Sequence, residues 1–299
     1  GIFFSKNLWG WGGNPKTLQG CGGSWCPVGT VQDRPRRQPR PATAFPYTKK
    51  GGRTSPTGRN AMKTLGIIGG MGPMATAYLL ELIIQMTAAK TDQEHLSAVV
   101  LNNPQVPDRT AYILDREKPS PLPVLEGMAH ALENLGCGVL CAPCVTSHYF
   151  YEELAGCVRV PFLHMVRETA KELQAAGKTR AGILATTGTV KMGLFQQALE
   201  EAGVEWAIPS EAGQRLVMSL IYEDIKAGRP ANMGKFQRAS EELFDQGCDC
   251  VILGCTELSL VKRDIPLGHG YLDALEVLSK RCVEACGAPL KEAYRQLIS

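Results

Sequence analysis

The first 61 residues contain almost no acidic residues and no apolar periodicity that could form a buried face. They hold four Lys and six Arg against the single acid Asp33, a formal charge of +9, which leaves −6 for the rest of a chain whose total is +3. They also contain 11 Gly and 7 Pro. Such a segment buries too little apolar surface to fold alone. We therefore expect residues 1–61 to be a disordered basic extension upstream of Met62, which precedes a strand pattern and has the features of a native start.

The sequence also has no recognisable membrane or secretion signal. Gly10, Gly12 and Gly13 interrupt the short apolar start, and no apolar run is long enough to span a bilayer. The basic run Arg34–Arg40 lacks interleaved aromatic residues, which disfavours a nucleic-acid site. These absences predict a cytoplasmic protein with neither a membrane nor a nucleic-acid partner.

Cysteine, in contrast, is plentiful, but the 11 cysteines are an odd number in a chain without a secretion signal. Disulfide frameworks are typical of oxidising compartments, so these thiols are expected to serve packing or chemistry. Four are expected to pack as small apolar residues: Cys137, Cys157, Cys282 and Cys286. A zinc site built from Cys141, Cys144, Cys248 and Cys250 is disfavoured. All four sulfurs would have to converge on one metal ion, and Cys248 and Cys250 are separated by only one residue of the same strand. We predict no metal.

From Met62 onward, continuous apolar strands alternate with amphipathic helices, a pattern typical of parallel sheets covered on both faces. Strands are expected near Thr64–Ile68, Ser97–Leu101, Gly138–Ala142, Val160–Leu163, Arg180–Ala185, Glu205–Ile208 and Asp249–Leu253. Helices are expected over Ala75–Lys90, Pro123–Leu135, Val166–Ala176, Leu194–Ala202, Gly213–Ala227 and Gly234–Gln246. Glycines at the ends of four of these helices are suited to a left-handed closing residue: Gly136, Gly177, Gly203 and Gly247.

The chain has two similar halves. Each half opens with a strand that runs into a turn of small residues, Gly69–Gly72 in the first and Thr186–Thr189 in the second. Each also ends with an apolar strand that delivers a cysteine followed by a threonine. The sequence therefore predicts an α/β fold of two similar parallel-sheet domains related by pseudo-symmetry, with the active site in the cleft between them. The expected bounds are 62–163 plus 273–299 for the first domain and 164–272 for the second.

The two cysteines that follow these strands, Cys144 and Cys255, are suited to acid and base chemistry. Ligands of open parallel sheets bind beyond the carboxyl ends of the strands. A thiol near a helix amino terminus has its thiolate favoured by the helix dipole. Two such groups on opposite sides of one carbon can remove and return a proton, which inverts the configuration without a cofactor. Their sulfurs would lie about 6 to 7 Å apart, with each reacting contact about 3 to 3.5 Å long, and would titrate as a coupled pair.

Several motifs together resemble the aspartate/glutamate racemase family, from about Met62 to the carboxyl terminus. They are Gly66–Pro73, Pro107–Arg109, Cys144–His148, Ile221–Tyr222, Ile225–Gly228 and Leu253–Leu258. The resemblance implies a pyridoxal-free racemase, with no cofactor, in which Cys144 and Cys255 exchange a proton at the α-carbon of an acidic amino acid. It also implies a homodimer.

The same resemblance assigns substrate-binding residues. Arg109 and Lys226 fall on positions that grip substrate carboxylates, and both side chains suit that task chemically. The remaining residues of the pocket would supply backbone N–H groups and hydroxyls for carboxylate and developing enolate charge: Met71, Gly72, Thr146, Thr187, Gly188 and Thr256.

Three neighbours of the cysteines affect this interpretation. Glu257 stands where the glutamate racemase branch has His, which favours aspartate, although an acid there also suits a helix amino terminus. Val145 stands where the family has Asn, so an amide donor is missing. His148 follows Cys144 by four residues, a spacing that allows it either to help hold a thiolate or to serve the structure.

Two other functions stay open on the sequence alone. A non-catalytic amino-acid or dicarboxylate binder would keep the cleft and lose turnover through Val145. A thiol-disulfide oxidoreductase would use the Cys-x-x-Cys pair Cys141 and Cys144.

Overall fold

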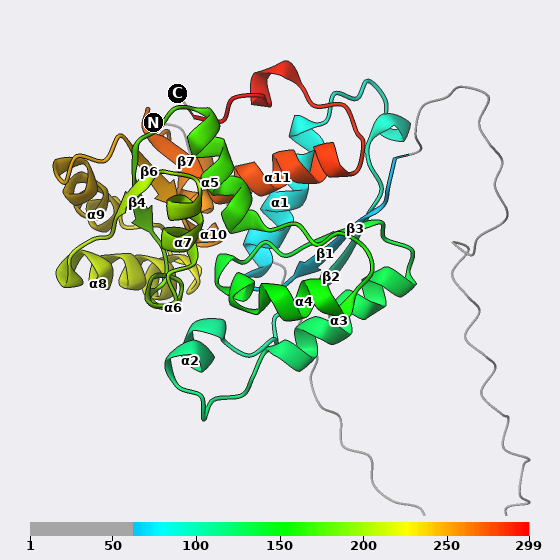
Figure 1. The fold of residues 1–299 in the computed structure, drawn as a ribbon, viewed down its shortest axis with the longest axis horizontal. Coiled ribbons are helices and arrows are strands. Elements are labelled where there is room, and N and C mark those ends of the chain that lie inside the picture. The colour runs from blue at the N-terminus through cyan, green and yellow to red at the C-terminus, as the bar shows by residue number, and fades with distance from the viewer. Residues whose placement is uncertain (1–61, 299) are drawn as a thin grey trace, which may run out of the picture. The chain divides into compact units, whose positions relative to one another are not determined.

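The structure, a computed structural model, describes residues 62–298, so the expected disordered extension lies outside the described residues (Figure 1). Two parallel sheets form its framework. In the first, the strand order is β2-β1-β3, with β2 Ala98–Asn102, β1 Leu65–Gly69 and β3 Val139–Cys141. In the second, the order is β5-β4-β6-β7, with β5 Glu205–Ala207, β4 Arg180–Leu184, β6 Cys250–Leu253 and β7 Tyr271–Asp273.

The two sheets repeat one topology. In each, the strand that opens the half is central, the next strand pairs on one side of it and the third strand pairs on the other, all in parallel. The fourth strand, β7, extends the second sheet next to β6. The predicted fold class, two similar α/β halves with parallel sheets, is confirmed.

Helices connect the strands, as parallel pairing requires. In the first half they are α1 Pro73–Met86, α2 Arg109–Leu114, α3 Leu122–Asn134 and α4 Tyr151–Cys157. In the second half and beyond they are α5 Met165–Ala175, α6 Thr187–Lys191, α7 Leu194–Glu201, α8 Glu211–Ser219, α9 Met233–Asp245, α10 Thr256–Asp264 and α11 Ala274–Ala285. The glycines expected to close four helices all have positive φ: Gly136, Gly177, Gly203 and Gly247.

Alternate strand residues face different layers, because successive side chains point to opposite faces of a sheet. Leu65 and Ile67 of β1 join a core cluster shared with Ile183 of β4, whereas Ile68 faces a separate cluster under α3 and α4. The shared cluster also contains residues of α1, α5 and α11. A third cluster lies under α8 and α9. The two halves are therefore joined by a common apolar core.

Several local features differ from the expectation. The strand expected over Val160–Leu163 is reduced to one parallel bridge between Leu140 and Phe162. Strand β7 and the helix α11 were not expected, whereas α10 is the helix expected to follow Cys255. The helix expected over Gly213–Ala227 changes at residue 220 into a π-turn, Leu220–Ile225, which ends with a hydrogen bond of 2.9 Å from the Lys226 backbone N–H to the Ile221 carbonyl. Among residues 62–298, no helix is long and apolar enough to cross a membrane.

Candidate active site

Cys144 lies just beyond the carboxyl end of β3, where the chain turns into a short 3-10 helix, Val145–Phe150. It occupies the N-cap position in extended conformation, with φ of −153°. The Ser147 hydroxyl donates to the Cys144 carbonyl at 2.6 Å and thereby fixes the turn. The Cys144 side chain is buried at 4% exposure. The sequence thus places this thiol at the sheet edge where ligands of parallel sheets bind.

Cys255 occupies the matching place in the second half. It follows β6 as the N-cap residue of α10, again in extended conformation, with φ of −139°. The preceding Gly254 allows this close approach, because a Cβ there would lie 2.7 Å from the Phe195 ring and 3.0 Å from the Leu184 carbonyl oxygen. Like Cys144, Cys255 is buried and has a free thiol.

Both cysteines line one narrow cavity between the two halves. The other residues that line it are Met71, Arg109, Thr110, Val145, Thr146, Thr186, Tyr222, Lys226, Thr256 and Glu257. Motifs from both halves therefore converge on one small cavity.

Arg109 brings a buried positive charge to this cavity from the first turn of α2. The Asp108 carboxylate caps that helix by accepting from the Ala111 N–H at 2.8 Å. The Arg109 guanidinium donates to the Pro107 carbonyl at 3.1 Å and to the Met71 carbonyl at 3.4 Å. Its Nε is buried and has no hydrogen-bond partner among the described residues. Burial opposes the guanidinium charge, but Cys144 and then Asp108 more than offset it and raise the Arg109 pKa.

Lys226 and Glu257 form an ion pair that also lines the cavity. The Lys226 Nζ donates to Glu257 Oε1 at 2.6 Å, and the Cys255 Sγ donates to Glu257 Oε2 at 2.9 Å. Burial and then the Glu257 carboxylate raise the pKa of the Cys255 thiol well above its ordinary value, and Lys226 partly offsets this. Burial lowers the Lys226 pKa, but Glu257 and Cys255 together raise it above its ordinary value. The π-turn sets the position of Lys226, since it adds one residue to the turn before it.

A cluster of threonine hydroxyls joins the two halves at the cavity. The Thr146 hydroxyl lies 3.0 Å from those of Thr186 and Thr189, which are 3.1 Å apart. The Thr110 hydroxyl donates to that of Thr186 at 3.3 Å. All four side chains are buried. These hydroxyls supply adjustable hydrogen bonds at the line where the halves meet.

Comparison with known proteins gives this geometry a family. The model of the Asp/Glu/Hydantoin racemase family matches residues 68–278. The chain belongs to this family. It is an amino-acid racemase of the aspartate/glutamate type.

The relatives of this racemase extend over most of the described residues. The broad specificity amino-acid racemase RacX of Bacillus subtilis is 29% identical over 229 residues, which cover 73% of this chain and 96% of the relative. The aspartate racemase of Picrophilus torridus is 28% identical with a TM-score of 0.67, covering 79% of this chain and 99% of that one. A glutamate racemase of Francisella tularensis shares the fold at 11% identity, with a TM-score of 0.55 over 75% of this chain and 80% of that one.

Two of the residues expected to bind substrate in this racemase lie elsewhere. Thr187 lines a neighbouring cavity under α8, and its hydroxyl accepts from Gln214 Nε2 at 3.3 Å. Gly188 packs against Thr110, which a Cβ on the glycine would approach to 3.1 Å. Thr186 lines the cavity in their place, because it caps α6 and accepts from the Thr189 N–H.

Three residues of the cavity were not expected as substrate contacts: Thr110, Thr186 and Tyr222. Signals for two of them were present, since Thr110 follows the motif that holds Arg109, and Tyr222 lies in a motif shared with the family. Gly72 lies at the rim, where a Cβ would come within 3.2 Å of Glu257 Oε1, and it lines an adjoining cavity with Arg109 and Lys226.

His148 contacts the backbone of Cys144. Its Nδ1 lies 3.0 Å from the Cys144 carbonyl oxygen, while the Met165 N–H donates to its Nε2 at 3.1 Å. Because Nε2 accepts, the proton of the neutral ring is on Nδ1. Burial lowers the His148 pKa and favours this neutral form. The hydrogen bonds thus support the structural alternative, in which the ring holds the turn around Cys144.

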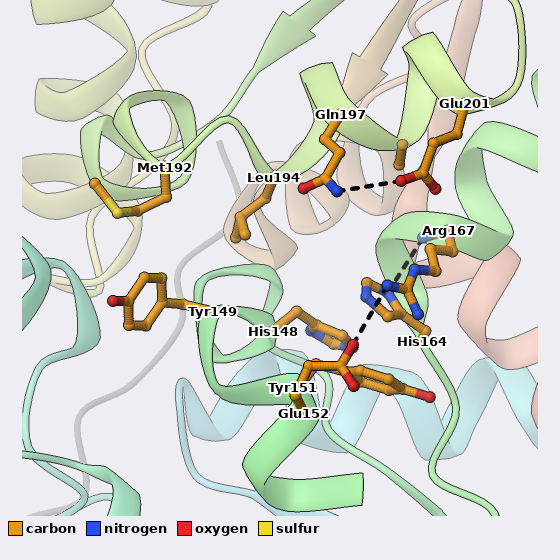
Figure 2. A pocket seen from close by; sticks show the side chains of 11 residues that line it. His148, Tyr149, Tyr151, Glu152, His164, Arg167, Met192, Leu194, Gln197 and Glu201 are labelled. Carbon is orange, nitrogen blue, oxygen red and sulfur yellow. Dashed lines mark hydrogen bonds and ion pairs between the residues drawn. The ribbon is translucent and has the colours of Figure 1, made fainter.

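Figure 2 shows a second cavity, to which His148 also contributes. Both halves of the racemase contribute to its wall: His148, Tyr149, Tyr151, Glu152, His164, Arg167, Met192, Leu194, Gln197, Ala198 and Glu201. Burial, His148 and Arg167 lower the His164 pKa to about 3, so this ring is neutral. This cavity shares no lining residue with the one that both cysteines line, and His148 belongs to its wall.

Proposed function

We propose that this protein racemises an acidic amino acid, in the first place aspartate, by exchanging a proton between the α-carbon and the thiols of Cys144 and Cys255. The observation that carries the proposal is the placement of both side chains in one cavity, each at a helix amino terminus and each from a different half. Two bases on opposite walls are what inversion at a carbon centre requires.

The reaction needs one thiolate and one thiol. The thiolate takes the α-proton, so the Cα–H bond breaks and its electron pair moves into the α-carboxylate as an enolate. The thiol on the other face then gives its proton to Cα and becomes the thiolate. The product has inverted configuration, no electrons are gained or lost, and the two sulfurs have exchanged roles. The same pair can therefore run the reverse reaction from the other enantiomer.

The remaining cavity residues are suited to hold the substrate through this change. A guanidinium makes a planar two-point contact with a carboxylate, so Arg109 fits the α-carboxylate on which the enolate charge develops. The hydroxyls of Thr110, Thr146 and Thr256 can donate to the same oxygens. Lys226 suits the side-chain carboxylate of the substrate, with its ammonium already oriented by Glu257.

Two observations support aspartate as the substrate. Glu257 replaces the His of glutamate racemases. The relative from Picrophilus torridus is an aspartate racemase. A broader range of amino acids is the second candidate, because Lys226 is already paired with Glu257 and the Bacillus subtilis relative has broad specificity.

The two other functions predict different behaviour. Against a thiol-disulfide oxidoreductase, Cys141 is fully buried in the core cluster shared by the halves, whereas Cys144 belongs to the cluster on the other face of β3. A binder without turnover predicts a different result in binding and activity assays. It would show saturable aspartate binding by calorimetry and no change in optical rotation, and Val145→Asn would restore activity.

The deciding experiment follows the α-proton in deuterated water. With L-aspartate, D-aspartate should form with deuterium at Cα, as read by proton NMR and chiral chromatography. Cys144→Ala and Cys255→Ala should each abolish racemisation. Each should still allow exchange of the α-proton in one enantiomer, and the two variants should act on opposite enantiomers. Cys157→Ala, whose thiol lies away from the cavity, is the matched control. Unchanged racemisation in either cysteine variant would refute the mechanism.

Three further predictions are part of this proposal. The protein acts as a homodimer in the cytoplasm, and the bounds of its domains are 62–163 plus 273–299 and 164–272. Light scattering tests the homodimer, fractionation of cells tests the cytoplasmic location, and limited proteolysis tests the domain bounds.

A further inference from the structure

The cavity that Cys144 and Cys255 line has two cationic side chains and one anionic side chain in its wall. Arg109 and Lys226 bring the positive charges, and Glu257 brings the negative charge. Among residues 62–298, no other acidic side chain lines this cavity. Aspartate at neutral pH carries the complementary set of two carboxylates and one ammonium. Its carboxylates have partners in Arg109 and Lys226, which leaves the ammonium as the charged group still to be matched.

We propose that Glu257 binds the α-ammonium of the substrate, so that each charged group of aspartate meets one side chain of opposite charge. This inference rests on the proposed racemisation and adds the third contact of the substrate in the same cavity. An ammonium that leaves water needs such a partner, because a charge buried without one is strongly destabilised.

The Glu257 carboxylate is placed to accept a further donor. The side chain is buried at 4% exposure in the first turn of α10. Its Oε1 accepts from Lys226 Nζ at 2.6 Å, and its Oε2 accepts from the Cys255 thiol at 2.9 Å. An ionised carboxylate has about four lone-pair sites, so these two donors leave room for an ammonium. The contact with Cys255 puts the carboxylate beside one of the sulfurs that would approach the α-carbon, the atom that carries the ammonium.

Asp108 is another acidic residue close to this site, and both oxygens of its carboxylate already have donors. Its Oδ1 accepts from the Ala111 N–H at 2.8 Å, and its Oδ2 accepts from the Tyr222 hydroxyl at 3.2 Å. Asp108 lines the adjoining cavity and does not line the one that holds both cysteines. The ammonium of a substrate held between the cysteines therefore meets Glu257 and not Asp108.

Lys226 and Glu257 can both contact the substrate while they stay paired with each other. A lysine ammonium has three N–H donors, and one of those of Lys226 goes to Glu257. The remaining donors suit the side-chain carboxylate of aspartate. The charges then alternate in sign from the substrate carboxylate to Lys226, to Glu257 and to the substrate ammonium. This alternation accounts for an ion pair in the wall of a cavity that takes a charged ligand.

Three contacts of this kind suit a reaction that inverts the α-carbon. The carboxylate, the ammonium and the side chain are the groups that Cα carries besides hydrogen. When these groups are held at fixed positions, the two enantiomers differ in the side toward which the Cα–H bond points. A proton can then leave toward one cysteine and arrive from the other while the three groups stay bound.

Calorimetry with two ligands tests the inference on the full-length protein. One ligand is racemic aspartate, because turnover leaves the composition of a racemate unchanged. The other is succinate, which has the same two carboxylates and lacks the ammonium. The unaltered protein should bind aspartate at least about tenfold more tightly than succinate, the usual contribution of a hydrogen bond between charged groups. Equal affinities for the two ligands would overturn the inference without the need for any variant.

Glu257→Gln should change the two affinities differently. It removes the negative charge at nearly constant size, so aspartate should bind about 10- to 100-fold more weakly. Succinate should bind at least as tightly as before, because Lys226 no longer shares its charge with a carboxylate. A residue that only held Lys226 in place would weaken both ligands by the same factor, and that result would refute the role of Glu257. Glu257→Asp, which keeps the charge, should retain a preference for aspartate.

A matched control comes from a second ion pair on the same helix. Lys262 of α10 binds Glu276 of α11 at 2.7 Å, close to the length of the pair at the cavity. Glu276→Gln should leave both affinities unchanged, and an equal loss of aspartate binding in this variant would contradict the role of Glu257. Binding is measured without product analysis, which separates this inference from racemisation. A protein that fails the deuterium assay can still prefer aspartate through Glu257, and a racemase can hold the ammonium without it.

Discussion

The first and second halves build the same framework and use it differently. β1, β2 and β3 have the same order and direction as β4, β5 and β6, and each set leads to a cysteine at a helix amino terminus. The charged residues differ: Arg109 of α2 lines the cavity together with Cys144, whereas the Glu257 carboxylate of α10 accepts directly from the Cys255 thiol. The repeated topology thus supplies symmetric positions, and side chains outside the repeated motifs make the two positions chemically distinct.

The largest effect is expected from changes that remove either member of the repeated pair. Cys144→Ser and Cys255→Ser should each lower the rate of racemisation by about 10² to 10⁴, the usual contribution of a positioned acid or base. Polarimetry measures the rate in both directions. Cys157→Ser should retain full activity. If one serine variant kept more than half of the activity, the two halves would not share the chemistry.

The next largest effect is expected at Arg109, where one substitution separates the positive charge from the planar shape of the guanidinium. Arg109→Lys keeps a positive charge but loses the planar guanidinium, so kcat/KM should fall by about 10- to 100-fold, equivalent to one charge-assisted hydrogen bond. Initial rates over a range of aspartate concentrations measure it. Arg116→Lys, on a side chain that contacts Tyr149 outside the cavity, is the control. Equal kcat/KM for Arg109→Lys and the unaltered protein would exclude two-point binding.

A smaller effect is expected where the halves meet. Thr186→Val keeps the shape and removes the hydroxyl that links Thr110, Thr146 and Thr189, so kcat/KM should fall about tenfold. Thr169→Val in α5, whose hydroxyl donates to the Met165 carbonyl at 2.8 Å, controls for the loss of a buried hydroxyl. A fall of the same size in both variants would assign the effect to stability.

The smallest effect on activity is expected at Asp273, which belongs to the strand without a counterpart in the first half. Burial and then Glu276 raise its pKa to about 7, and its Oδ2 has no partner among the described residues. The folded state therefore binds this proton more tightly than the unfolded chain, so stability should fall as pH rises from about 4 to 7. Asp273→Asn should flatten that slope at unchanged racemase activity. Thermal unfolding at a series of pH values measures the slope, and a slope unchanged by the substitution would contradict the assignment.

The strands and the two cysteines were predictable because the signals for them are local and repeated. Apolar runs ending in Cys144 and Cys255 specify buried strands whose carboxyl ends carry the thiols. Strand β7 was missed because Tyr271–Asp273 is three residues long and follows a segment without periodicity. The π-turn was missed because its helical pattern is continuous in the sequence and the added residue appears only in the hydrogen bonds.

The contacts within the cavity were less predictable, because they join residues far apart in the chain. Lys226 and Glu257 are 31 positions apart, and each was expected to contact substrate or a helix end; their pairing became visible only in three dimensions. Thr187 was expected at the cavity, but Thr186 lines it. Consecutive side chains at the start of a helix point in different directions, so the sequence did not show which of the two threonines faces the cavity. His148 kept its predicted proximity to Cys144, but its hydrogen bond goes to the carbonyl.

The hydroxyls of Thr146, Thr186 and Thr189 form a closed triangle with sides of 3.0 to 3.1 Å. In such a ring each oxygen donates to one neighbour and accepts from the other, and rotation about the C–O bonds reverses the circulation of all three protons without moving a heavy atom. The hydroxyls of Thr146 and Thr186, which line the cavity, can therefore switch between donating and accepting toward a bound molecule while every carbon and oxygen atom stays in place.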